Sequence, residues 1–215
     1  MTAQIIAVPL AKSQAAQAAD TLARAFLDDP FFTYALPDSD RRLQVLIWFY
    51  KRFVRYALRH GRIHTTPSLD GIAIWFGPRK TDLDWLGVLQ TGLFLVPLKL
   101  SSQEFRRTME LQNCADRLHA KLATGPHWYL SELGVEPSRQ RQGVGHALLQ
   151  PMLAQADHDL LPCYLETNKE KNVRFYEANG FQIAGLEQAT PQAPHTWAML
   201  RNPEQHASDP QIVEM

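Results

Sequence analysis

The sequence predicts a mixed α/β fold in a single domain. Its 215 residues are 45% hydrophobic and 20% charged, which is typical of a globular protein with an ordinary core. Segments with the apolar spacing of helices alternate with short apolar runs typical of strands. No internal repeat and no linker rich in glycine and serine divides the chain. We therefore expect one domain over residues 1–201 and a flexible C-terminal tail over residues 202–215.

The N-terminal half predicts three strands and four helices. Ser13 is the expected N-cap of the first helix, and Asp28-Asp29-Pro30 should end it, because proline disfavours the helical conformation of the residue before it. The expected helices are residues 16–27, 41–59, 82–98 and 102–122, the third of them interrupted near Gly92 and Pro97. The expected strands are residues 2–8, 62–66 and 71–76. Together they favour helices packed on a sheet.

After Gly125-Pro126 the pattern changes to shorter elements. The expected strands are residues 127–135, 163–167, 181–186 and 196–200. The expected helices are residues 143–159 and 170–179, and Gly180 ends the second of them. With no linker between the two halves, this order favours one mixed α/β domain.

Charge and cysteine content argue against several functional classes. Lys and Arg total 22 and Asp and Glu total 22, whereas proteins that bind nucleic acids normally carry a basic excess. Two cysteines do not form a disulfide framework, and no Cys-x-x-Cys or His-x-His spacing predicts a metal site. The most apolar stretch, residues 85–100, is too short and too interrupted to span a membrane. We expect a cytoplasmic protein, monomeric or homodimeric, without a metal, a nucleic acid partner or a membrane partner.

A glycine-spaced turn before a predicted helix gives the clearest sign of function. The strand that ends at Val135 leads through residues 136–142 to Gly143-Val144-Gly145, which opens the helix. Free N–H groups at a helix N-terminus, together with the helix dipole, suit a pyrophosphate. The third glycine of a Rossmann fingerprint is missing, as is the Gly-Lys-Ser/Thr of a P-loop. An ordinary turn before a helix is the alternative interpretation.

A second motif, NVRFYEANGF at residues 172–181, places two aromatic side chains on a short helix. Alone it favours core packing, but the phosphate-type loop upstream favours a binding role. With the QRQGVG segment at residues 140–145, it resembles the GNAT superfamily of acyl-CoA-dependent N-acetyltransferases, and most closely the branch that contains puromycin N-acetyltransferase. The resemblance is clear from residue 127 to about residue 200 and weaker before it. Many family members have asparagine seven residues before Tyr176, where this chain has Lys169.

The resemblance implies a fold and a mode of binding the cosubstrate acetyl-CoA. The implied sheet is mostly antiparallel, flanked by helices and splayed between its fourth and fifth strands, here residues 127–135 and 163–167. The pantetheine arm would lie in that gap, between Leu133, Gly134 and Val135 on one side and Asn172 on the other. The residues expected at the pyrophosphate are Gln140, Arg141, Gln142, Gly143, Val144, Gly145 and His146.

The resemblance also implies direct attack of an amine on the thioester within a ternary complex. Tyr176 would lie near the sulfur and protonate the leaving thiolate, because a phenol with a pKa near ~10 stays protonated at neutral pH. Glu132 is one candidate base, since strand alternation puts it on the same face as Trp128 and Leu130. Glu166, on the neighbouring strand, is the other. The alternative for each glutamate is a structural or ion-paired carboxylate.

The acceptor site is expected in the N-terminal half of the chain. Asp28 and Asp29 are candidates for attracting a cationic amine, and their alternative role is a helix stop with Pro30. Phe32 is one of several aromatic residues expected to wall the pocket. The expected function is acetyl transfer from acetyl-CoA to a small-molecule amine. Two alternatives remain open: a non-catalytic acyl-CoA-binding or sensor protein, and a protein or peptide N-acetyltransferase.

Overall fold

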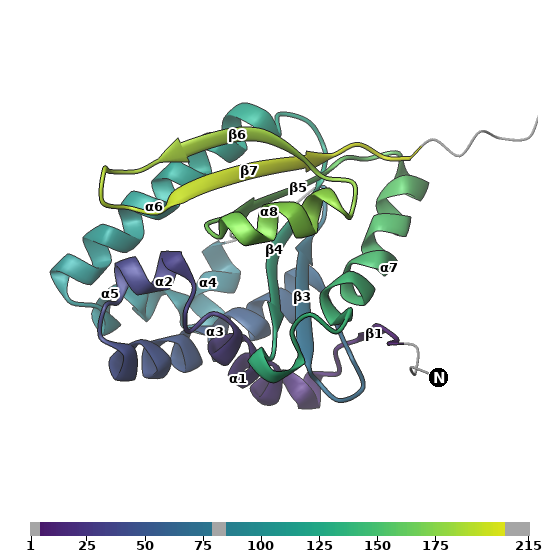
Figure 1. Cartoon of the computed structure of the whole chain (residues 1–215). Helices are drawn as coiled ribbons and strands as arrows, with labels where there is room; N and C mark the ends of the chain where they lie inside the picture. The colour runs from purple at the N-terminus through teal and green to yellow at the C-terminus, as the bar shows by residue number, and fades with distance from the viewer. Residues whose placement is uncertain (1–4, 79–84, 205–215) are drawn as a thin grey trace, which may run out of the picture.

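A seven-stranded sheet runs through the molecule and is covered by helices on both faces (Figure 1). The computed structural model describes residues 5–78 and 85–204. The strand order is β1-β2-β3-β4-β5-β7-β6, in which β4 and β5 run parallel and the other described pairs run antiparallel. The strands are β1 (Val8–Pro9), β2 (Gly61–Thr65), β3 (Gly71–Phe76), β4 (Trp128–Val135), β5 (Cys163–Thr167), β6 (Gln182–Gln188) and β7 (His195–Arg201). The predicted mixed α/β class is confirmed.

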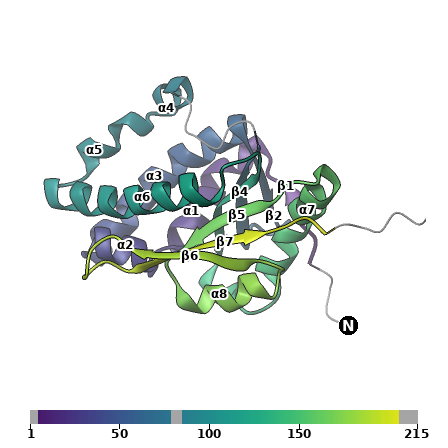
Figure 2. The same cartoon turned by 90° about the horizontal axis from the view of Figure 1, so that it is seen from above.

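The helices form a layer on each side of this sheet, as the view from above shows (Figure 2). They are α1 (Ala15–Ala25), α2 (Pro30–Ala35), α3 (Ser39–His60), α4 (Trp85–Thr91), α5 (Val96–Lys99), α6 (Ser102–Leu122), α7 (Val144–Asp159) and α8 (Glu170–Glu177). Short 3-10 turns are η1 (Lys12–Gln14), η2 (Leu93–Leu95) and η3 (Pro137–Arg139). Helices α1, α3 and α6 lie on one face, and α7 and α8 lie on the other. No helix in the described ranges is long and apolar enough to cross a membrane.

The core is divided by the sheet into two main hydrophobic clusters. Strand β3 is buried along its whole length, because its side chains alternate between them. Ile72 and Ile74 pack with α1 and α3, while Ala73 and Trp75 pack with α7. Burying one isoleucine side chain stabilises a fold by ~1.5–3 kcal/mol. Strand β3 therefore holds the two helical layers together beside β4, which is the strand that carries the predicted site.

The N-terminal segment differs from its prediction. Of the predicted strand 2–8, only Val8 joins the sheet, in β1, and residues 1–4 lie outside the described ranges. The predicted cap Ser13 lies inside η1 instead. The carboxamide of Gln14 accepts the Ala11 N–H at 3.0 Å and takes the capping role. Gln14 is the third residue after Ala11, a position from which a glutamine side chain can reach back to the N-cap N–H. It therefore makes the capping contact that was expected from Ser13.

The turn at Asp28-Asp29-Pro30 starts a helix that the sequence analysis did not predict. Helix α1 ends at Ala25, and Pro30 is the first residue of α2. The Asp29 carboxylate accepts the Phe31 N–H at 3.0 Å as the N-cap of α2. Proline is well tolerated at the first helical position, where its missing N–H has no intrahelical partner. The same three residues can therefore end one helix and begin another.

The remaining elements follow the predictions closely. Helix α6 matches its predicted range, residues 102–122, and begins with a capping box between Ser101 and Glu104. The predicted interruption of residues 82–98 occurs at Gly92, which has a φ of 74°, while residues 82–84 lie outside the described ranges. The predicted tail is described only to residue 204.

Candidate active site

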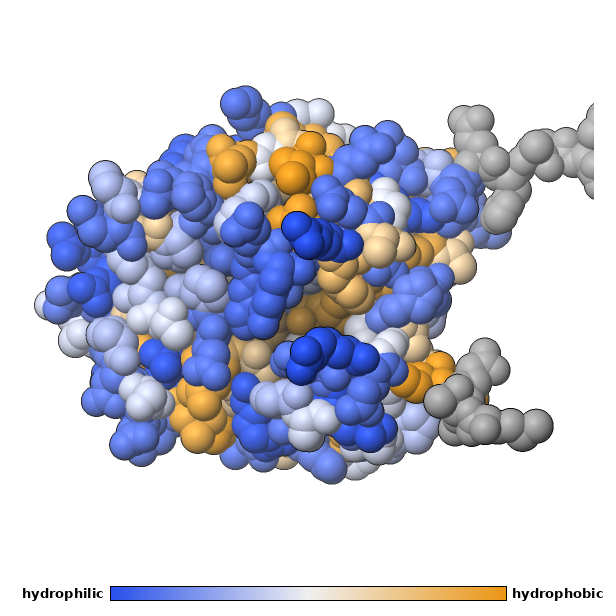
Figure 3. Space-filling view, viewed as in Figure 1, coloured by the Kyte–Doolittle hydropathy of each residue, from blue (hydrophilic) through white to orange (hydrophobic). Residues whose placement is uncertain are grey.

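Strands β4 and β5 separate after three paired residues. Their register joins Trp128 to Cys163 and Leu130 to Leu165, and no pairing continues beyond that point. The β5 side of β4 is therefore left without a strand partner from Ser131 to Val135. Figure 3 shows this face of the molecule hollowed near its centre, below α8, with hydrophobic colour on the floor of the hollow. The structure confirms the splay that the family resemblance implied.

The loop before α7 has the backbone conformation expected of an anion-binding turn. Arg141 and Gly143 have positive φ values of 59° and 84°. Gly143 is the N-cap of α7 and supplies no side-chain cap, so the first N–H groups of the helix are left without a side-chain acceptor from the cap. These groups belong to Val144, Gly145 and His146, three of the residues predicted to hold the pyrophosphate.

The other predicted loop residues shape this turn with their side chains. The Gln140 amide donates to the carbonyl of Val135 at 3.1 Å, and the Gln142 amide donates to the carbonyl of Ser138 at 3.0 Å. His146 hydrogen-bonds through Nδ1 to Asn179 Oδ1 at 2.8 Å, which ties the start of α7 to the end of α8. The loop is therefore held by its own polar contacts.

Glycine at two predicted positions allows close packing. A Cβ atom at Gly145 would lie 3.2 Å from the Phe175 ring, so this glycine lets α7 approach α8. A Cβ atom at Gly134 would lie 2.9 Å from Leu22 of α1, so the second glycine lets α1 approach β4. Asn172, across the gap, donates its side-chain amide to Thr167 Oγ1 at 3.3 Å, at the end of β5.

Glu132 does not share a face with Trp128 and Leu130, which corrects the sequence interpretation. The register between β3 and β4 passes from Ile74–Glu132 to Trp75–Leu130, so Ser131 is an extra residue. A bulge of one residue reverses the alternation of side chains along a strand. Trp128 and Leu130 consequently pack towards α7, whereas Glu132 points towards α3.

Glu132 lies in a cluster of polar groups at the edge of the aromatic core. The Tyr50 hydroxyl of α3 donates to Glu132 Oε2 at 3.2 Å. Burial raises the pKa of Glu132 to about 8, with the charge of Asp29 adding to the shift and the Tyr50 bond opposing it. The ring of Tyr50 is stacked on Phe26 with the centroids 5.7 Å apart, and Phe32 meets it edge-on at 6.3 Å. Phe32 therefore packs in the aromatic cluster around Tyr50, and its place in an acceptor pocket stays a prediction.

Tyr176 reaches the same region from the opposite layer. Its side chain is 6% exposed and packs against Phe175 and Phe181. Burial raises the pKa of Tyr176 above its ordinary value, and the nearby charges of Asp29 and Glu132 raise it further. The phenol therefore keeps its proton throughout the neutral pH range.

The two aspartates of the α1–α2 turn have different surroundings. Asp28 is exposed. Asp29 is 7% exposed, and its Oδ2 lies 3.5 Å from the ammonium of Lys169. Burial raises the pKa of Asp29, while Lys169 and the bond from the Phe31 N–H oppose that shift. The structure thus brings Asp29, and not Asp28, into the cluster with Glu132 and Tyr176.

Glu166 belongs to a second polar cluster, under α6. Burial raises the pKa of Glu166 to about 7, and the hydroxyls of Tyr129 and Tyr164 near it oppose the shift. The Tyr164 hydroxyl has no partner of good hydrogen-bond geometry within the described ranges. His119 Nδ1 lies 3.9 Å from Glu166 Oε1. Glu132 acts on Tyr176, whereas Glu166 lies beside Tyr164 and His119. Tyr129 lies near both glutamates, since the charge of each raises its pKa.

Two residues of the first cluster were not assigned a role from the sequence. Tyr50 lies within the apolar face of a long amphipathic helix, where a tyrosine cannot be told from a core residue. Lys169 stands where many family members have asparagine, and this departure is the feature of the sequence that could have drawn attention to it. Cys163 is fully buried, and burial raises the pKa of its thiol to about 12, which makes it a poor nucleophile.

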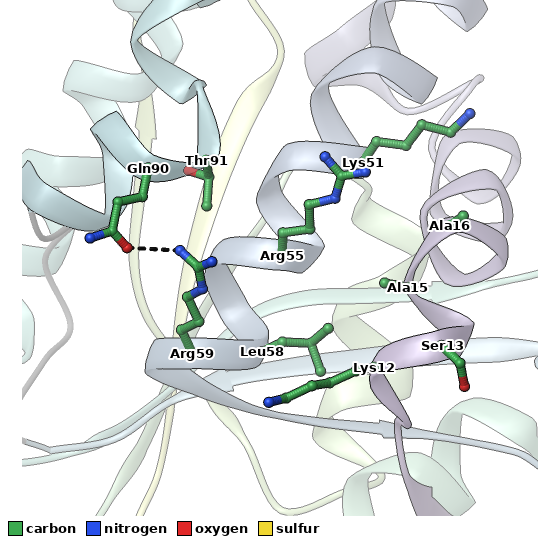
Figure 4. A pocket seen from close by; sticks show the side chains of 10 residues that line it. All are labelled: Lys12, Ser13, Ala15, Ala16, Lys51, Arg55, Leu58, Arg59, Gln90 and Thr91. Atoms are coloured by element: carbon green, nitrogen blue, oxygen red, sulfur yellow. Dashed lines mark hydrogen bonds between the residues drawn. The ribbon is translucent and has the colours of Figure 1, made fainter.

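Two surface cavities lie outside the β4–β5 gap. The first, about 580 Å³, lies between the start of α1, α3 and α4 and is edged by basic side chains (Figure 4). Its lining residues are Lys12, Ser13, Ala15, Ala16, Lys51, Arg55, Leu58, Arg59, Gln90 and Thr91. The second, about 590 Å³, lies along α7 and the end of α8 and includes His146. In the described part of the chain, no group of three or more His, Cys, Asp or Glu side chains is arranged to hold a metal ion.

Known proteins share both this sequence pattern and this fold. The sequence profile of the acetyltransferase (GNAT) domain matches residues 110–183. A Schizosaccharomyces pombe protein described as an uncharacterized N-acetyltransferase is 29% identical over 171 residues, which cover 77% of this chain and 69% of that protein. A Corynebacterium glutamicum structure, described as histone acetyltransferase HPA2 and related acetyltransferase, superposes with a TM-score of 0.66 at 23% identity, covering 95% of this chain and 99% of that one. Arylalkylamine N-acetyltransferase 2 of Aedes aegypti superposes with a TM-score of 0.60 at 11% identity, covering 94% and 100%.

The family match at residues 110–183 spans β4, the loop that opens α7, and β5. None of the three proteins is described as a puromycin N-acetyltransferase, so that branch stays a prediction. The match over residues 110–183 identifies a GNAT acetyltransferase domain in the chain, and together with the N-acetyltransferase relative it supports an acetyl-CoA-dependent N-acetyltransferase.

Proposed function

We propose that this enzyme transfers the acetyl group of acetyl-CoA to an amine of a small molecule by direct attack within a ternary complex. The observation that carries the proposal is the group of carboxylates and aromatic rings beside Tyr176. Asp29 supplies negative charge for a cationic amine, and the Glu132 carboxyl beside it is a proton acceptor once it has ionised. Phe26 and Phe32 supply an apolar wall next to them. Small-molecule sites are commonly apolar with a few convergent polar groups.

In this proposal acetyl-CoA lies across the open edge of β4. Its pantetheine arm runs beside Leu133, Gly134 and Val135, with Asn172 on the far side of the gap. Its pyrophosphate lies at the first turn of α7, where unpaired N–H groups and the helix dipole favour negative charge. The side chains of Gln140 and Gln142 hold the loop in shape.

The same cluster supplies the proton transfers that amide formation requires. Glu132 of this cluster takes the proton of the amine in first place, and Glu166 of the second cluster is the alternative. The nitrogen then attacks the carbonyl carbon, the C–S bond breaks, and the Tyr176 hydroxyl protonates the thiolate. The buried and protonated thiol of Cys163 favours this direct route over a covalent intermediate.

The class of acceptor is the part of this proposal that most needs an experiment. The structural neighbours include proteins named for a histone acceptor and for arylalkylamine acceptors, and identities of this size speak only for the fold. We expect saturating acetyl-CoA, at a hundred times its Kd, to stabilise the protein by ~2.7 kcal/mol, or about 5–10 °C in Tm. Addition of a small aromatic or aliphatic amine should then release free CoA thiol.

Three results would change the proposal. The absence of any rise in Tm would contradict the proposed binding of acetyl-CoA. A rise in Tm without thiol release from any amine would favour a binding or sensor protein. Thiol release with peptides bearing a free N-terminus, and not with small amines, would favour a protein or peptide acetyltransferase.

The variant Gly145→Glu tests the position of the pyrophosphate. It places a carboxylate in the first turn of α7, where it would repel the cosubstrate, and we expect the Kd for CoA to rise by about tenfold or more, or ~1.4 kcal/mol. Glutamate near a helix N-terminus interacts favourably with the dipole, although the Phe175 ring has to shift slightly to admit it. Calorimetric titration with CoA measures the change.

Gly125→Glu is the matched control, because a Cβ atom there meets nothing within 4 Å. Its CoA affinity should equal that of the wild type. If the folded Gly145→Glu variant also keeps the wild-type affinity, the pyrophosphate does not bind at α7.

A further inference from the structure

Lys169 places an amine of the chain itself inside the proposed active site. It is the N-cap residue of α8, two residues after the end of β5. Its Nζ lies 3.5 Å from Asp29 Oδ2, and the two side chains are only 17% and 10% exposed. Lysine is among the residues least often buried. The pair joins the end of β5 to the turn between α1 and α2, across the gap in which acetyl-CoA is expected.

The surroundings of this ammonium are those that an acceptor amine needs. Asp29, its partner, is close enough to Glu132 and to Tyr176 for its charge to raise the pKa of both. The ion pair with Asp29 therefore links the lysine amine to a candidate base and the candidate acid. A cationic acceptor that approaches Asp29 has to displace Lys169 first.

We propose that Lys169 is an internal acetyl acceptor: when no substrate amine is present, the enzyme transfers the acetyl group of bound acetyl-CoA to Nζ of Lys169. The inference rests on the proposed function in one respect, because it uses the same acetyl-CoA site and the same proton-transferring groups. It concerns a modification site, and it does not depend on which external amine is the substrate.

The step balances with acetyl-CoA as the single co-reactant. The Lys169 ammonium gives one proton to a neighbouring carboxylate, from which it passes to solvent. The nitrogen lone pair forms the N–C bond, the C–S bond breaks, and the thiolate takes a proton from Tyr176. The second proton lost by the nitrogen returns to the Tyr176 oxygen. The products are acetyl-lysine, free CoA and one proton.

Acetylation of Lys169 changes the site in two ways. An amide is neutral, so it no longer forms an ion pair with Asp29. It also occupies the place that an incoming amine would need. The modified enzyme should therefore turn over external amines more slowly than the unmodified enzyme.

The test is a time course of the full chain with acetyl-CoA and no amine, followed by peptide mass spectrometry. Lys171 lies two residues further along α8 and is exposed, as is Lys121 at the end of α6, so both report uncatalysed acetylation. We expect Lys169 to be acetylated faster than either by about tenfold or more. Lysines acetylated by chemistry alone would show the opposite order, because exposed amines react first.

Two further experiments separate enzyme-catalysed acetylation of Lys169 from uncatalysed acetylation. Tyr176→Phe should slow acetylation of Lys169 and leave that of Lys171 unchanged, and an excess of a turned-over amine should protect Lys169. Acetylation of Lys169 no faster than that of Lys171, or no protection by the amine, would overturn the inference.

The outcomes also keep the inference apart from the proposed function. Turnover of small amines with Lys169 unmodified contradicts the proposal that Lys169 is an acetyl acceptor and supports the proposed function. Acetylation of Lys169 without turnover of any small amine removes the small-molecule acceptor and leaves the inference in place. If acetyl-CoA causes no thermal stabilisation and Lys169 is not acetylated, both are removed.

Discussion

Replacing Tyr176 with phenylalanine is expected to lower kcat by about 10²-fold while the Kd for acetyl-CoA stays nearly constant. The phenyl ring keeps the contacts with Phe175 and Phe181, so the variant loses the hydroxyl and little of the packing. Because burial raises the pKa of Tyr176, the wild-type hydroxyl is a protonated donor throughout the neutral range. Thioesters have good leaving groups, so the lower end of the usual ~10²–10⁴ range for general acid catalysis is expected. Steady-state kinetics and CoA titration measure the two constants.

Tyr56→Phe is the matched control for this variant. Tyr56 is 1% exposed and lies on α3, outside the site, so loss of its hydroxyl can change stability but not the reaction. A kcat for Tyr176→Phe within about threefold of the wild type would remove Tyr176 from the mechanism. Water would then be the proton source.

Replacing Glu132 with glutamine is expected to lower kcat/KM by about 10²-fold and to change its dependence on pH. Burial raises the pKa of Glu132 to about 8, so the wild-type carboxyl is protonated, and cannot accept a proton, below that pH. The wild-type rate should therefore rise as the pH increases through about 8, and the variant should lack this limb. Assays with two acceptor amines of different pKa identify the group responsible for this rise. If Glu132 is responsible, kcat/KM rises at the same pH with both amines.

Glu166→Gln is the control that separates the two candidate bases. Glu166 lies under α6 with His119, Tyr129 and Tyr164. Its replacement should leave the limb near pH 8 in place. Loss of that limb in Glu166→Gln, with the limb retained in Glu132→Gln, would transfer the role of base to Glu166.

The stability of the same Glu132→Gln variant provides a second readout. The folded protein holds the Glu132 proton more tightly than the unfolded chain, whose glutamate has a pKa near ~4.3. The free energy of unfolding therefore falls as the pH rises from about 4.5 to about 8, where the unfolded state releases this proton first. The Tm of the variant relative to the wild type should increase across that window and then level off. A constant difference in Tm would show that Glu132 has an ordinary pKa in the folded state.

Elements with local determinants were predictable from the sequence. Helix α6 carries its own capping box at Ser101 and Glu104, and its apolar spacing repeats over the whole helix, so its bounds agree with the prediction. The turn before α7 needs a positive φ at Gly143, and glycine adopts that conformation at little cost. Both signals lie within a few residues of the structure that they specify. The same is true of the two motifs that carry the resemblance to the GNAT superfamily.

Features that depend on distant contacts were not predictable in the same way. The bulge at Ser131 turns Glu132 towards α3, and strict alternation along β4 predicted the opposite face. The Tyr50 hydroxyl meets Glu132 from a helix far away in the sequence. Nothing in the apolar spacing of α3 separates a tyrosine with a functional hydroxyl from one that packs.

The sequence by itself determined most helices and strands and the glycine turn before α7, because glycine conformation, helix capping and apolar periodicity act over short stretches of chain. The splayed sheet and the binding of the cosubstrate at that turn were implied by the resemblance to the GNAT superfamily. Only the tertiary structure decided that Glu132 shares its surroundings with Tyr176 while Glu166 lies elsewhere, and that Lys169 rests against Asp29. Those contacts join strands and turns that meet only after the sheet has formed. Their partners are too far apart in the chain to leave any periodic pattern, so packing of the two helical layers against the sheet selects them.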